Sequence, residues 1–421
     1  MTRPTARRSA GTRRALVGAC VGNAVEWYDF AIYGAFATVL AQVFFPPGEQ
    51  AALAATFAIF ATSFVARPIG AMLVGRRSDQ RGRRPVLSRM IAVMTGATAA
   101  IALIPSWSVI GVLAPALLLL LRLTQGFSVG GEVASSVAFL SESAPAGSRG
   151  RFGGWHTASI AIGLSAGYAV AALLSAAFPD DVLMDWGWRL AFLSALPLGL
   201  VARYIRRRLD ETPMFEAVAA PAKPRVIADV VRGRAGAIGR GFLLVTTLSV
   251  AFNLWFVFLP GYVAAEATIP LGAALGSGVI GLLTAAVTAP VMGRLSDRLG
   301  RRPVLITGTL AIAVFAVPGF ALAGRAIAGL LLADVLLAGL LGTLVVTAFV
   351  AELFPTEVRA TGVAVTYGLS TAIFGGTAPL VATLLAGAES AWAIPGYLTV
   401  VALLGLAAAV TARETAFDRF R

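Results

Sequence analysis

The sequence is poor in the residues that form disulfides and soft-metal sites. Its 421 residues include one cysteine, Cys20, and one histidine, His156. A single cysteine excludes a disulfide within the chain, and one cysteine with one histidine cannot supply the ligands of a Cys/His metal site. We therefore expect no bound metal and no cofactor.

Charged residues are also scarce, at 13% of the chain, whereas hydrophobic residues make up 58%. A soluble protein of this size carries roughly twice that charged fraction. Apolar runs of about 20 residues, long enough to cross a bilayer, recur along the whole length. The composition therefore predicts a polytopic membrane protein.

The apolar runs are expected to cross the membrane as helices, because a helix satisfies its own backbone hydrogen bonds in hydrocarbon. Barrel strands would instead alternate in polarity over about ten residues. The first run is too long for a cleaved signal peptide, and carboxylates interrupt it. Twelve spans are predicted, at about 15–41, 52–75, 86–104, 109–140, 155–178, 187–205, 237–264, 272–293, 303–323, 326–350, 361–387 and 392–411.

The 34 Lys and Arg residues are unevenly distributed between the two sides of these spans. An even number of crossings places both termini on one side, and most basic residues fall in the segments on that side. The opposite loops hold only Arg189 and Arg325. The positive-inside rule then places both termini in the cytoplasm. This asymmetry accounts for the net charge of +13 without a nucleic-acid partner.

Two loop sequences recur at a spacing of about half the chain. GRRSDQRGRRPVL at 75–87 and GRLSDRLGRRPVL at 293–305 are identical at ten of thirteen positions. A second pattern, Glu-x-x-Pro-x-x-x-Arg, begins at Glu142 and again at Glu352. Such repeats predict two related halves of six helices each, in parallel topology.

The predicted halves are residues 1–205 and 237–421, joined by a cytoplasmic linker at 206–236. The linker is polar, mixed in charge and contains three prolines. It is too short for a further folded domain, although one surface helix fits within it.

The repeated loops predict a conformational latch. Their glycines allow close backbone approach, and their charged side chains can pair in one conformation and separate in another. The alternative is that the arginines only set the topology, but that role does not require the fixed Gly and Asp spacing. The predicted latch residues are Gly75, Asp79, Gly82, Arg83, Gly293, Asp297, Arg298, Gly300, Arg301, Glu142, Arg149, Glu352 and Arg359.

With these motifs the chain resembles the major facilitator superfamily. The resemblance rests on twelve spans in two related halves and on Gly-x-x-x-Asp-x-x-Gly-Arg-Arg at 75–84 and 293–302. Gln80 departs from the family loop, which usually carries arginine there, as the second copy does at Arg298. Further segments resemble the metabolite:proton symporter branch: EWYDF at 26–30, RPIGA at 67–71, LRLTQGFSVGGE at 121–132, WGWRL at 186–190, RRRLDETP at 206–213 and AELFPTEVRATG at 351–362.

The resemblance implies an all-α major facilitator fold in a bacterial inner membrane and proton-driven uptake by alternating access. Members similar to this chain carry α-ketoglutarate, citrate, shikimate, or proline and betaine. We expect a monomer that imports a small organic acid, such as a di- or tricarboxylate or a shikimate-like acid. A zwitterion carrier and an uncoupled facilitator are the alternatives.

Other classes of membrane protein lack support in the sequence. A metal-ligand cluster, a phosphate-binding Gly-rich loop and a nucleophile beside a base are all absent, so an enzyme is not expected. Extramembrane segments are too short to form the ligand-binding domain of a receptor.

The first span carries two carboxylates on one helical face. Gly22, Glu26, Asp29 and Tyr33 lie at i, i+4, i+7 and i+11. An ionisable group in a spanning helix costs about 2.5–3.5 kcal/mol, so this face is expected to point into the bundle. A carboxylate there can take up a proton when its surroundings change.

A rise of 1.5 Å per residue places further charged residues at comparable depths in other spans. Glu132 and Arg67 are predicted to lie at about the same distance from the cytoplasmic ends of their helices as Glu26, while Asp29 and Arg122 lie farther into the membrane. Glu26, Asp29, Glu132 and Arg67 are therefore the candidates for proton coupling or gating. The alternative, permanent salt bridges that fix helix packing, stays open for all four and is favoured for Arg67.

Arg122 is the candidate contact for a solute anion, because it lies near mid-membrane with no carboxylate one turn away. Further candidates for solute binding are Tyr33, Gln125, Asn253 and Tyr367. His156 is expected to make an interfacial hydrogen bond, with proton transfer as the alternative. Asp334, the only acid well inside the second half, is either a cavity residue or a capped polar group.

Overall fold

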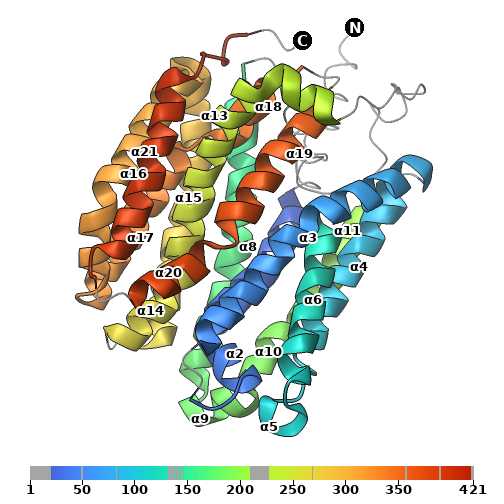
Figure 1. Cartoon of the computed structure of the whole chain (residues 1–421), viewed down its shortest axis with the longest axis vertical. Helices are drawn as coiled ribbons and strands as arrows, with labels where there is room; N and C mark the ends of the chain where they lie inside the picture. Colours follow the sequence, from blue (N-terminus) through green and yellow to red (C-terminus); the bar gives the residue numbers. More distant parts are fainter. Residues whose placement is uncertain are drawn as a thin grey trace, which may run out of the picture.

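The computed structural model describes residues 20–48, 51–81, 83–130, 137, 141, 144–145, 147–208, 227–267, 269–355, 358–387 and 390–418. Every regular element within these ranges is a helix. Figure 1 shows long helices running side by side, with the start of α8 and the end of α21 near the same end of the bundle. We call this the latch end, and the end that holds α5, α9 and α14 the far end.

The first half begins with a helical segment at residues 20–35 that continues, after a break at Phe36, into α2. The elements that follow are α2 (Ala37–Phe44), α3 (Ala52–Arg81), α4 (Arg83–Ile101), α5 (Trp107–Ile110), α6 (Leu113–Val129), α8 (Arg149–Ala177), α9 (Asp180–Val182), η1 (Leu183–Gly187), α10 (Trp188–Leu193) and α11 (Ala195–Arg208).

The second half begins with α13, which bends at Arg234 and continues through a π-helical turn, η2. Its elements are α13 (Ile227–Asn253), η2 (Leu254–Phe258), α14 (Leu259–Glu266), α15 (Leu271–Leu299), α16 (Arg301–Ala323), α17 (Ile327–Thr343), α18 (Val346–Glu352), α19 (Arg359–Ser370), η3 (Thr371–Gly375), α20 (Ala378–Ala386) and α21 (Ala393–Thr411).

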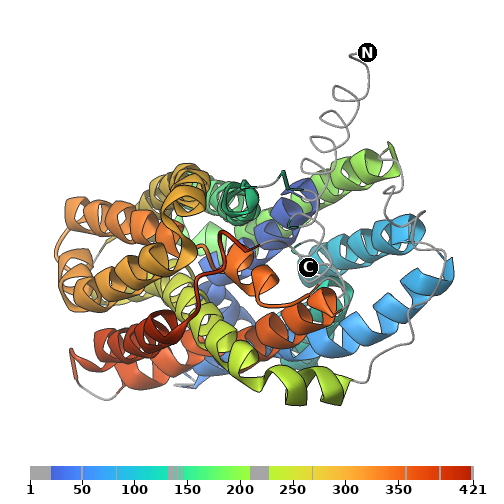
Figure 2. The same cartoon turned by 90° about the horizontal axis from the view of Figure 1, so that it is seen from above.

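The predicted twelve-span, all-α architecture is confirmed, since each predicted span has a helix or an interrupted helix in its place. Eight helices within the described ranges are long and apolar enough to cross a membrane, and two shorter apolar helices cover Ser88–Ile101 and Leu113–Val129. Figure 2 shows the second-half helices, from yellow to red, grouped beside the blue α3 and α4 of the first half.

The boundaries at 205 and 237 stay a prediction. Helix α11 runs on to Arg208, and α13 already begins at Ile227, inside the predicted linker. One surface helix was expected within the linker, without fixed bounds; residues 209–226 lie outside the described residues, and residues 227–233 are helical before the bend of α13 at Arg234.

Glycines bring the halves together where α8 crosses α15. A Cβ on Gly150 would collide with the Gly293 carbonyl, and a Cβ on Gly293 would collide with the Gly150 carbonyl. Gly154 meets the backbone of α15 at Ala289 in the same way. Small residues allow such close helix contact where lipid provides no hydrophobic driving force.

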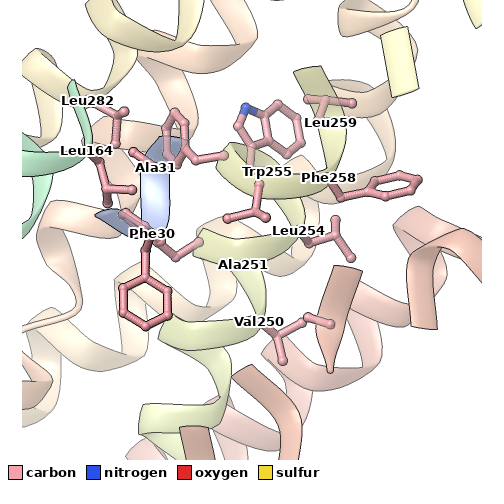
Figure 3. Packing of buried hydrophobic residues seen from close by; sticks show 14 of the residues in the cluster. Phe30, Ala31, Leu164, Val250, Ala251, Leu254, Trp255, Phe258, Leu259 and Leu282 are labelled. Carbon is pink, nitrogen blue, oxygen red and sulfur yellow. The ribbon is translucent and has the colours of Figure 1, made fainter. Parts of the chain in front are cut away.

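An apolar core lies farther along α8 and α15, where the first helix, α8, α15 and η2 meet (Figure 3). Phe30 and Leu164 approach it from the first half, and Trp255 and Phe258 approach it from the second. Nearer the far end, a Cβ on Gly34 would lie 2.9 Å from the Val257 side chain. The halves are therefore packed closely beside η2.

Candidate functional site

A cavity lies between the halves, lined by the first helix, α3 and α8 on one wall and by α13, α18, α19 and η3 on the other. Among the described lining residues Arg67 is the only charged one. The lining residues are Asn23, Trp27, Phe64, Arg67, Pro68, Ala71, Gly130, His156, Thr157, Ile160, Leu248, Ser249, Phe252, Asn253, Thr347, Ala364, Tyr367, Gly368 and Thr371.

Arg67 forms a buried ion pair on the first-half wall. Its Nη2 lies 3.3 Å from Glu26 Oε1, so the predicted proximity of these residues is confirmed. The guanidinium also stacks on the rings of Phe64, at 4.4 Å, and Phe30, at 4.9 Å. The pair leaves the described residues of this wall with no net charge, and the aromatic faces stabilise the cation. Glu132, the other predicted member, lies outside the described residues.

Asp29 and Arg122 are joined by a chain of hydrogen bonds rather than by a direct ion pair among the described residues. Arg122 Nη1 donates to Gln125 Oε1 at 2.9 Å. Gln125 Nε2 donates to Thr98 Oγ1 at 2.7 Å, and Thr98 Oγ1 donates to Asp29 Oδ2 at 2.7 Å. The first helix, α4 and α6 are thereby linked through one polar chain.

Arg122 is fully buried and is not one of the lining residues of the cavity. It donates to Ser63 Oγ at 3.1 Å and stacks on the Tyr33 ring at 4.3 Å. The Tyr33 hydroxyl donates to the Thr56 carbonyl at 2.9 Å. Because Arg122, Tyr33 and Gln125 do not line this cavity, their contact with solute stays a prediction.

The second-half wall is neutral and polar. Asn253 and Tyr367, both predicted to bind solute, line it. The Tyr367 hydroxyl lies 3.1 Å from Thr347 Oγ1, and Asn253 Nδ2 donates to the Ser249 carbonyl at 2.8 Å.

Asn23, Trp27, His156 and Thr98 are among the residues of the site that were not predicted as site residues. Asn23 donates to Ser159 Oγ at 2.8 Å and to the His156 carbonyl at 3.3 Å, and it could have been found as a polar residue inside the first span. His156 lines the cavity, and neither ring nitrogen has a hydrogen-bond partner among the described residues. The interfacial hydrogen bond expected for His156 is therefore wrong within this part of the chain.

Asp334 is a capped buried group rather than a cavity residue. Its Oδ1 accepts a hydrogen bond from Trp255 Nε1 at 2.7 Å, and its Oδ2 accepts one from Ser277 Oγ at 2.6 Å. It does not line the cavity. The carboxyl thus connects α17 to η2 and α15.

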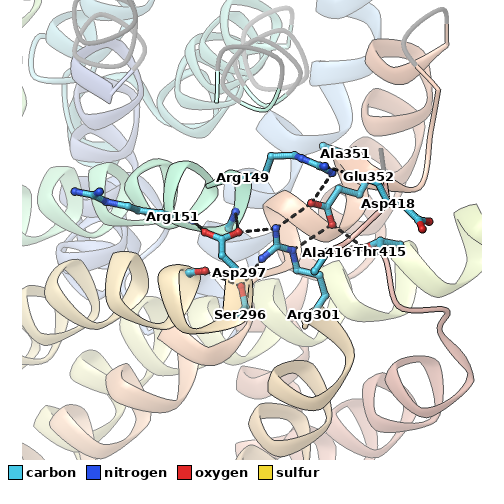
Figure 4. Close-up of polar contacts among 12 residues, drawn as sticks. Arg149, Arg151, Ser296, Asp297, Arg301, Ala351, Glu352, Thr415, Ala416 and Asp418 are labelled. Atoms are coloured by element: carbon cyan, nitrogen blue, oxygen red, sulfur yellow. Dashed lines mark hydrogen bonds and ion pairs between the residues drawn. The ribbon is translucent and has the colours of Figure 1, made fainter. Parts of the chain in front are cut away.

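A cluster of charged residues at the latch end joins the two halves (Figure 4). Arg149, from the first half, lies 3.1 Å from Glu352 Oε1, and Arg301 Nη2 lies 2.9 Å from the same oxygen. Arg301 Nη2 also lies 2.8 Å from Asp297 Oδ1, which accepts the Gly150 backbone N–H at 2.8 Å. Four of the predicted latch residues, Arg149, Asp297, Arg301 and Glu352, are therefore brought together.

The segment after α21, residues 412–418, lies across this cluster. Thr415 Oγ1 donates to Glu352 Oε2 at 2.6 Å, and Arg149 Nη2 donates to the Asp418 carbonyl at 2.7 Å. Glu414 accepts the backbone N–H groups of Arg301 and Arg302 at 2.8 and 3.0 Å. Partial burial opposes the ionisation of Glu414, but backbone donors outweigh it and hold the pKa of this carboxyl below its usual range.

The remaining predicted latch residues divide into two groups. In the second half, Gly300 has φ +104° between α15 and α16. Arg359 is buried and donates to the Ala351 carbonyl at 3.1 Å. Arg298 is exposed and does not belong to the cluster among the described residues. Gly82 and Glu142 lie outside the described residues, as do the side chains of Asp79 and Arg83; Gly75 lies within α3, but its packing is likewise outside what the structure describes.

A helical bundle with a central cavity between two halves and a charged cluster at one end is the architecture of a membrane transporter. Residues 15–221 match the family described as "Sugar (and other) transporter", and residues 271–419 match the family described as "Major Facilitator Superfamily". The chain belongs to the major facilitator superfamily, which comprises transporters rather than enzymes.

Two bacterial relatives align over nearly the whole chain. The proline/betaine transporter of Escherichia coli strain K12 is 34% identical over 96% of this chain and 84% of its own length. The glycine betaine/proline/ectoine/pipecolic acid transporter OusA of Dickeya dadantii is 35% identical over the same shares.

The xylose transporter XylE from E. coli provides a solved structure with the same fold. In its partially occluded inward-open conformation it superimposes with a TM-score of 0.76, at 18% identity, over 97% of this chain and 100% of that chain.

Proposed function

We propose that this chain is a proton-coupled importer of a small zwitterion, such as proline or betaine. The charge balance of the cavity carries the proposal. Arg67 is the only charged residue among the described lining residues, and Glu26 pairs with it at 3.3 Å. A wall whose described residues carry no net charge suits a solute with no net charge, because a buried charge without a counter-charge is costly.

The two ends of a zwitterion would find different surroundings in this cavity. The Arg67 guanidinium and the Trp27 indole N–H can donate to a carboxylate. Phe252 and Tyr367 also line the cavity, and their aromatic rings can stabilise the cationic nitrogen. The names of both bacterial relatives, which include proline and betaine, support this solute class.

The organic acid expected from the sequence fits this cavity less well when it carries several carboxylates. Two or three negative charges would meet one guanidinium that is already paired. A monocarboxylate such as shikimate needs only one cation, so it belongs in the test as a discriminating solute.

We propose that proton coupling depends on the chain of hydrogen bonds that joins Asp29 to Arg122 through Thr98 and Gln125. Protonation of Asp29 removes a buried negative charge from the same polar network as Arg122. The Thr98 hydroxyl and the Gln125 amide can reorient in response, because each both donates and accepts. The latch would then open as the halves move in alternating access.

The orientation in the membrane follows from the charge asymmetry of the loops. We place the latch end and both termini in the cytoplasm, in a bacterial inner membrane, with the monomer as the working unit. The solute, protons and the bilayer are the partners that this function requires.

Uptake into proteoliposomes tests the proposal. Labelled proline, betaine, shikimate, α-ketoglutarate and citrate are each supplied with and without an inward proton gradient. Proline or betaine is expected to accumulate only with the gradient. Accumulation of citrate or α-ketoglutarate instead would contradict the zwitterion assignment, and uptake that equilibrates regardless of the gradient would identify a facilitator.

A further inference from the structure

Four side chains on the cavity wall have buried polar atoms without partners. Trp27 Nε1, Arg67 Nε, both ring nitrogens of His156 and Asn253 Oδ1 make no hydrogen bond within the part of the chain that the structure describes. All four residues line the same cavity. Buried polar atoms are usually paired, so a group of unpaired atoms around one cavity indicates the polar groups of the ligand that fits there.

The orientation of the Asn253 amide follows from its neighbour. Its Nδ2 lies 2.8 Å from the Ser249 carbonyl, which can only accept a hydrogen bond. The amide nitrogen therefore faces Ser249, and Oδ1 is the atom left unpaired. Asn253 is 2% exposed, so Oδ1 is a buried acceptor on the second-half wall.

The opposite wall presents donors. The indole Nε1 of Trp27 and the guanidinium of Arg67 carry only N–H groups. Both residues belong to the first half, on the first helix and α3. His156 does not distinguish the two ends of a ligand, because a neutral imidazole both donates and accepts. Apart from those of His156, the buried unpaired atoms of the cavity are therefore donors on the first half and an acceptor on the second.

We infer that the solute carries at least one N–H on its cationic nitrogen, which donates to Asn253 Oδ1 while its carboxylate accepts from Trp27 and Arg67. This inference rests on the proposed zwitterion transport and narrows its substrate class to amino acids whose ammonium group is primary, secondary or tertiary. A quaternary ammonium has no N–H and would leave Oδ1 unpaired in the bound state. Sites that hydrogen-bond a ligand N–H reject analogues that lack it. Proline fits this class, whereas betaine does not.

The same arrangement places the ligand between the halves. A carboxylate held by the first half and an N–H held by the second half connect the two walls of the cavity. Binding therefore favours a conformation in which Trp27 and Asn253 are close enough to contact one small molecule. Solutes that satisfy only one wall would bind without drawing the halves together.

A series of methylated prolines tests the inference. Binding of proline, N-methylproline and N,N-dimethylproline to the full chain in nanodiscs compares two, one and no N–H groups on otherwise similar rings. We expect the first two to bind with similar affinity and the third about tenfold more weakly, the size expected from the loss of one hydrogen bond. In Asn253→Ala, proline should lose about that factor, and the affinity of N,N-dimethylproline should change little.

Asn23→Ala is the matched control, because Asn23 lines the same cavity but its amide already donates to Ser159 and His156. This variant should change the affinities of all three ligands by the same factor. Asn253→Ser, which keeps a smaller acceptor, should retain part of the discrimination if Asn253→Ala fails to fold.

The outcomes separate this inference from the proposed function. If N,N-dimethylproline binds wild type as tightly as proline, or Asn253→Ala weakens all three equally, the inference is overturned while zwitterion transport stands. If none of the three binds and a carboxylate from the uptake panel does, the inference and the proposed function both fall.

Discussion

The three buried acids of the described spans differ in what surrounds each carboxyl. Glu26 faces the Arg67 cation, Asp29 accepts a hydrogen bond from a hydroxyl, and Asp334 accepts from an indole and a hydroxyl. These surroundings imply different roles, because Glu26 neutralises a cation, Asp29 joins the hydrogen-bond chain that reaches Arg122, and Asp334 links α17 to η2 and α15. Only Glu26 has its counter-ion in direct contact.

The hydroxyl of Thr98 is predicted to be necessary for coupling. Thr98→Val keeps the shape of the side chain but removes the donor to Asp29 and the acceptor for Gln125. We expect gradient-driven accumulation to fall about tenfold, which corresponds to about 1.4 kcal/mol, while solute counterflow without a gradient is retained. Thr98→Ser keeps the hydroxyl and should behave like wild type. Equal accumulation by the Val and Ser variants would show that proton coupling does not depend on the hydrogen bonds between Asp29 and Arg122.

Asp334 is predicted to be structural. Asp334→Asn retains an acceptor for Trp255 and a polar partner for Ser277, so transport should persist. Asp334→Leu leaves both partners unpaired and should lower the stability by roughly 2–4 kcal/mol, measured by chemical denaturation in detergent. Loss of proton-driven uptake in Asp334→Asn at unchanged stability would instead assign this acid to coupling.

Residue-level prediction from the sequence succeeded where helical geometry decided the outcome. Glu26 and Arg67 were paired correctly because depth along two straight helices is set by a fixed rise per residue. Thr98 could not be identified, since a threonine in an apolar span is common and gives no periodic signal. Trp27 was equally ambiguous, because an indole inside a span usually contributes packing alone.

Among the helices, the crossing of α8 and α15 is the contact most sensitive to side-chain size. A Cβ at position 293 would meet the backbone of Gly150, which cannot move aside without shifting α8. Gly276 lies on the same helix with no atom within 4 Å of an added Cβ. Gly276 is therefore a control for Gly293, because both lie in α15 but only Gly293 is tightly packed.

Gly293→Ala is therefore predicted to lower the stability by about 1–3 kcal/mol through overpacking and to impair transport. Gly276→Ala should be neutral or slightly stabilising, because alanine favours the helix by up to about 1 kcal/mol. Thermal unfolding and uptake of both variants provide the measurement. Equal stability and equal uptake in the Gly293→Ala and Gly276→Ala variants would contradict the close approach of α8 and α15.

The existence of the spanning helices followed from hydropathy, but their interruptions did not. The π-helical turns at Leu254–Phe258 and Thr371–Gly375 depend on contacts between helices rather than on local sequence. The extension of α13 back to Ile227 was likewise missed, because a polar segment beyond a span resembles a linker.

For the whole molecule, the latch cluster is the described charged contact between the halves. Glu352→Ala removes the acceptor that Arg149, Arg301 and Thr415 share. Spin labels are placed at positions 151 and 298, both of which are exposed. In Glu352→Ala we expect double electron–electron resonance to give a longer mean distance between the labels and a broader distance distribution. The Cys20→Ser background leaves no other cysteine to label.

The exposed pair of Arg413 and Asp418, at 3.5 Å, provides the control at the same end. Solvent-exposed pairs contribute about 0–1 kcal/mol, so Arg413→Ala should leave the label distance unchanged. An unchanged distance in Glu352→Ala would show that the cluster does not hold the latch end together.

Proton movement driven by the solute tests the central claim most directly. Proteoliposomes loaded with a pH-sensitive dye receive external proline at equal pH on both sides, beside a matched Asp29→Asn preparation. Symport predicts that the interior of the wild-type vesicles acidifies as proline enters, and that the Asp29→Asn vesicles do not acidify. Proline entry without a change in internal pH in the wild type would contradict proton-coupled transport.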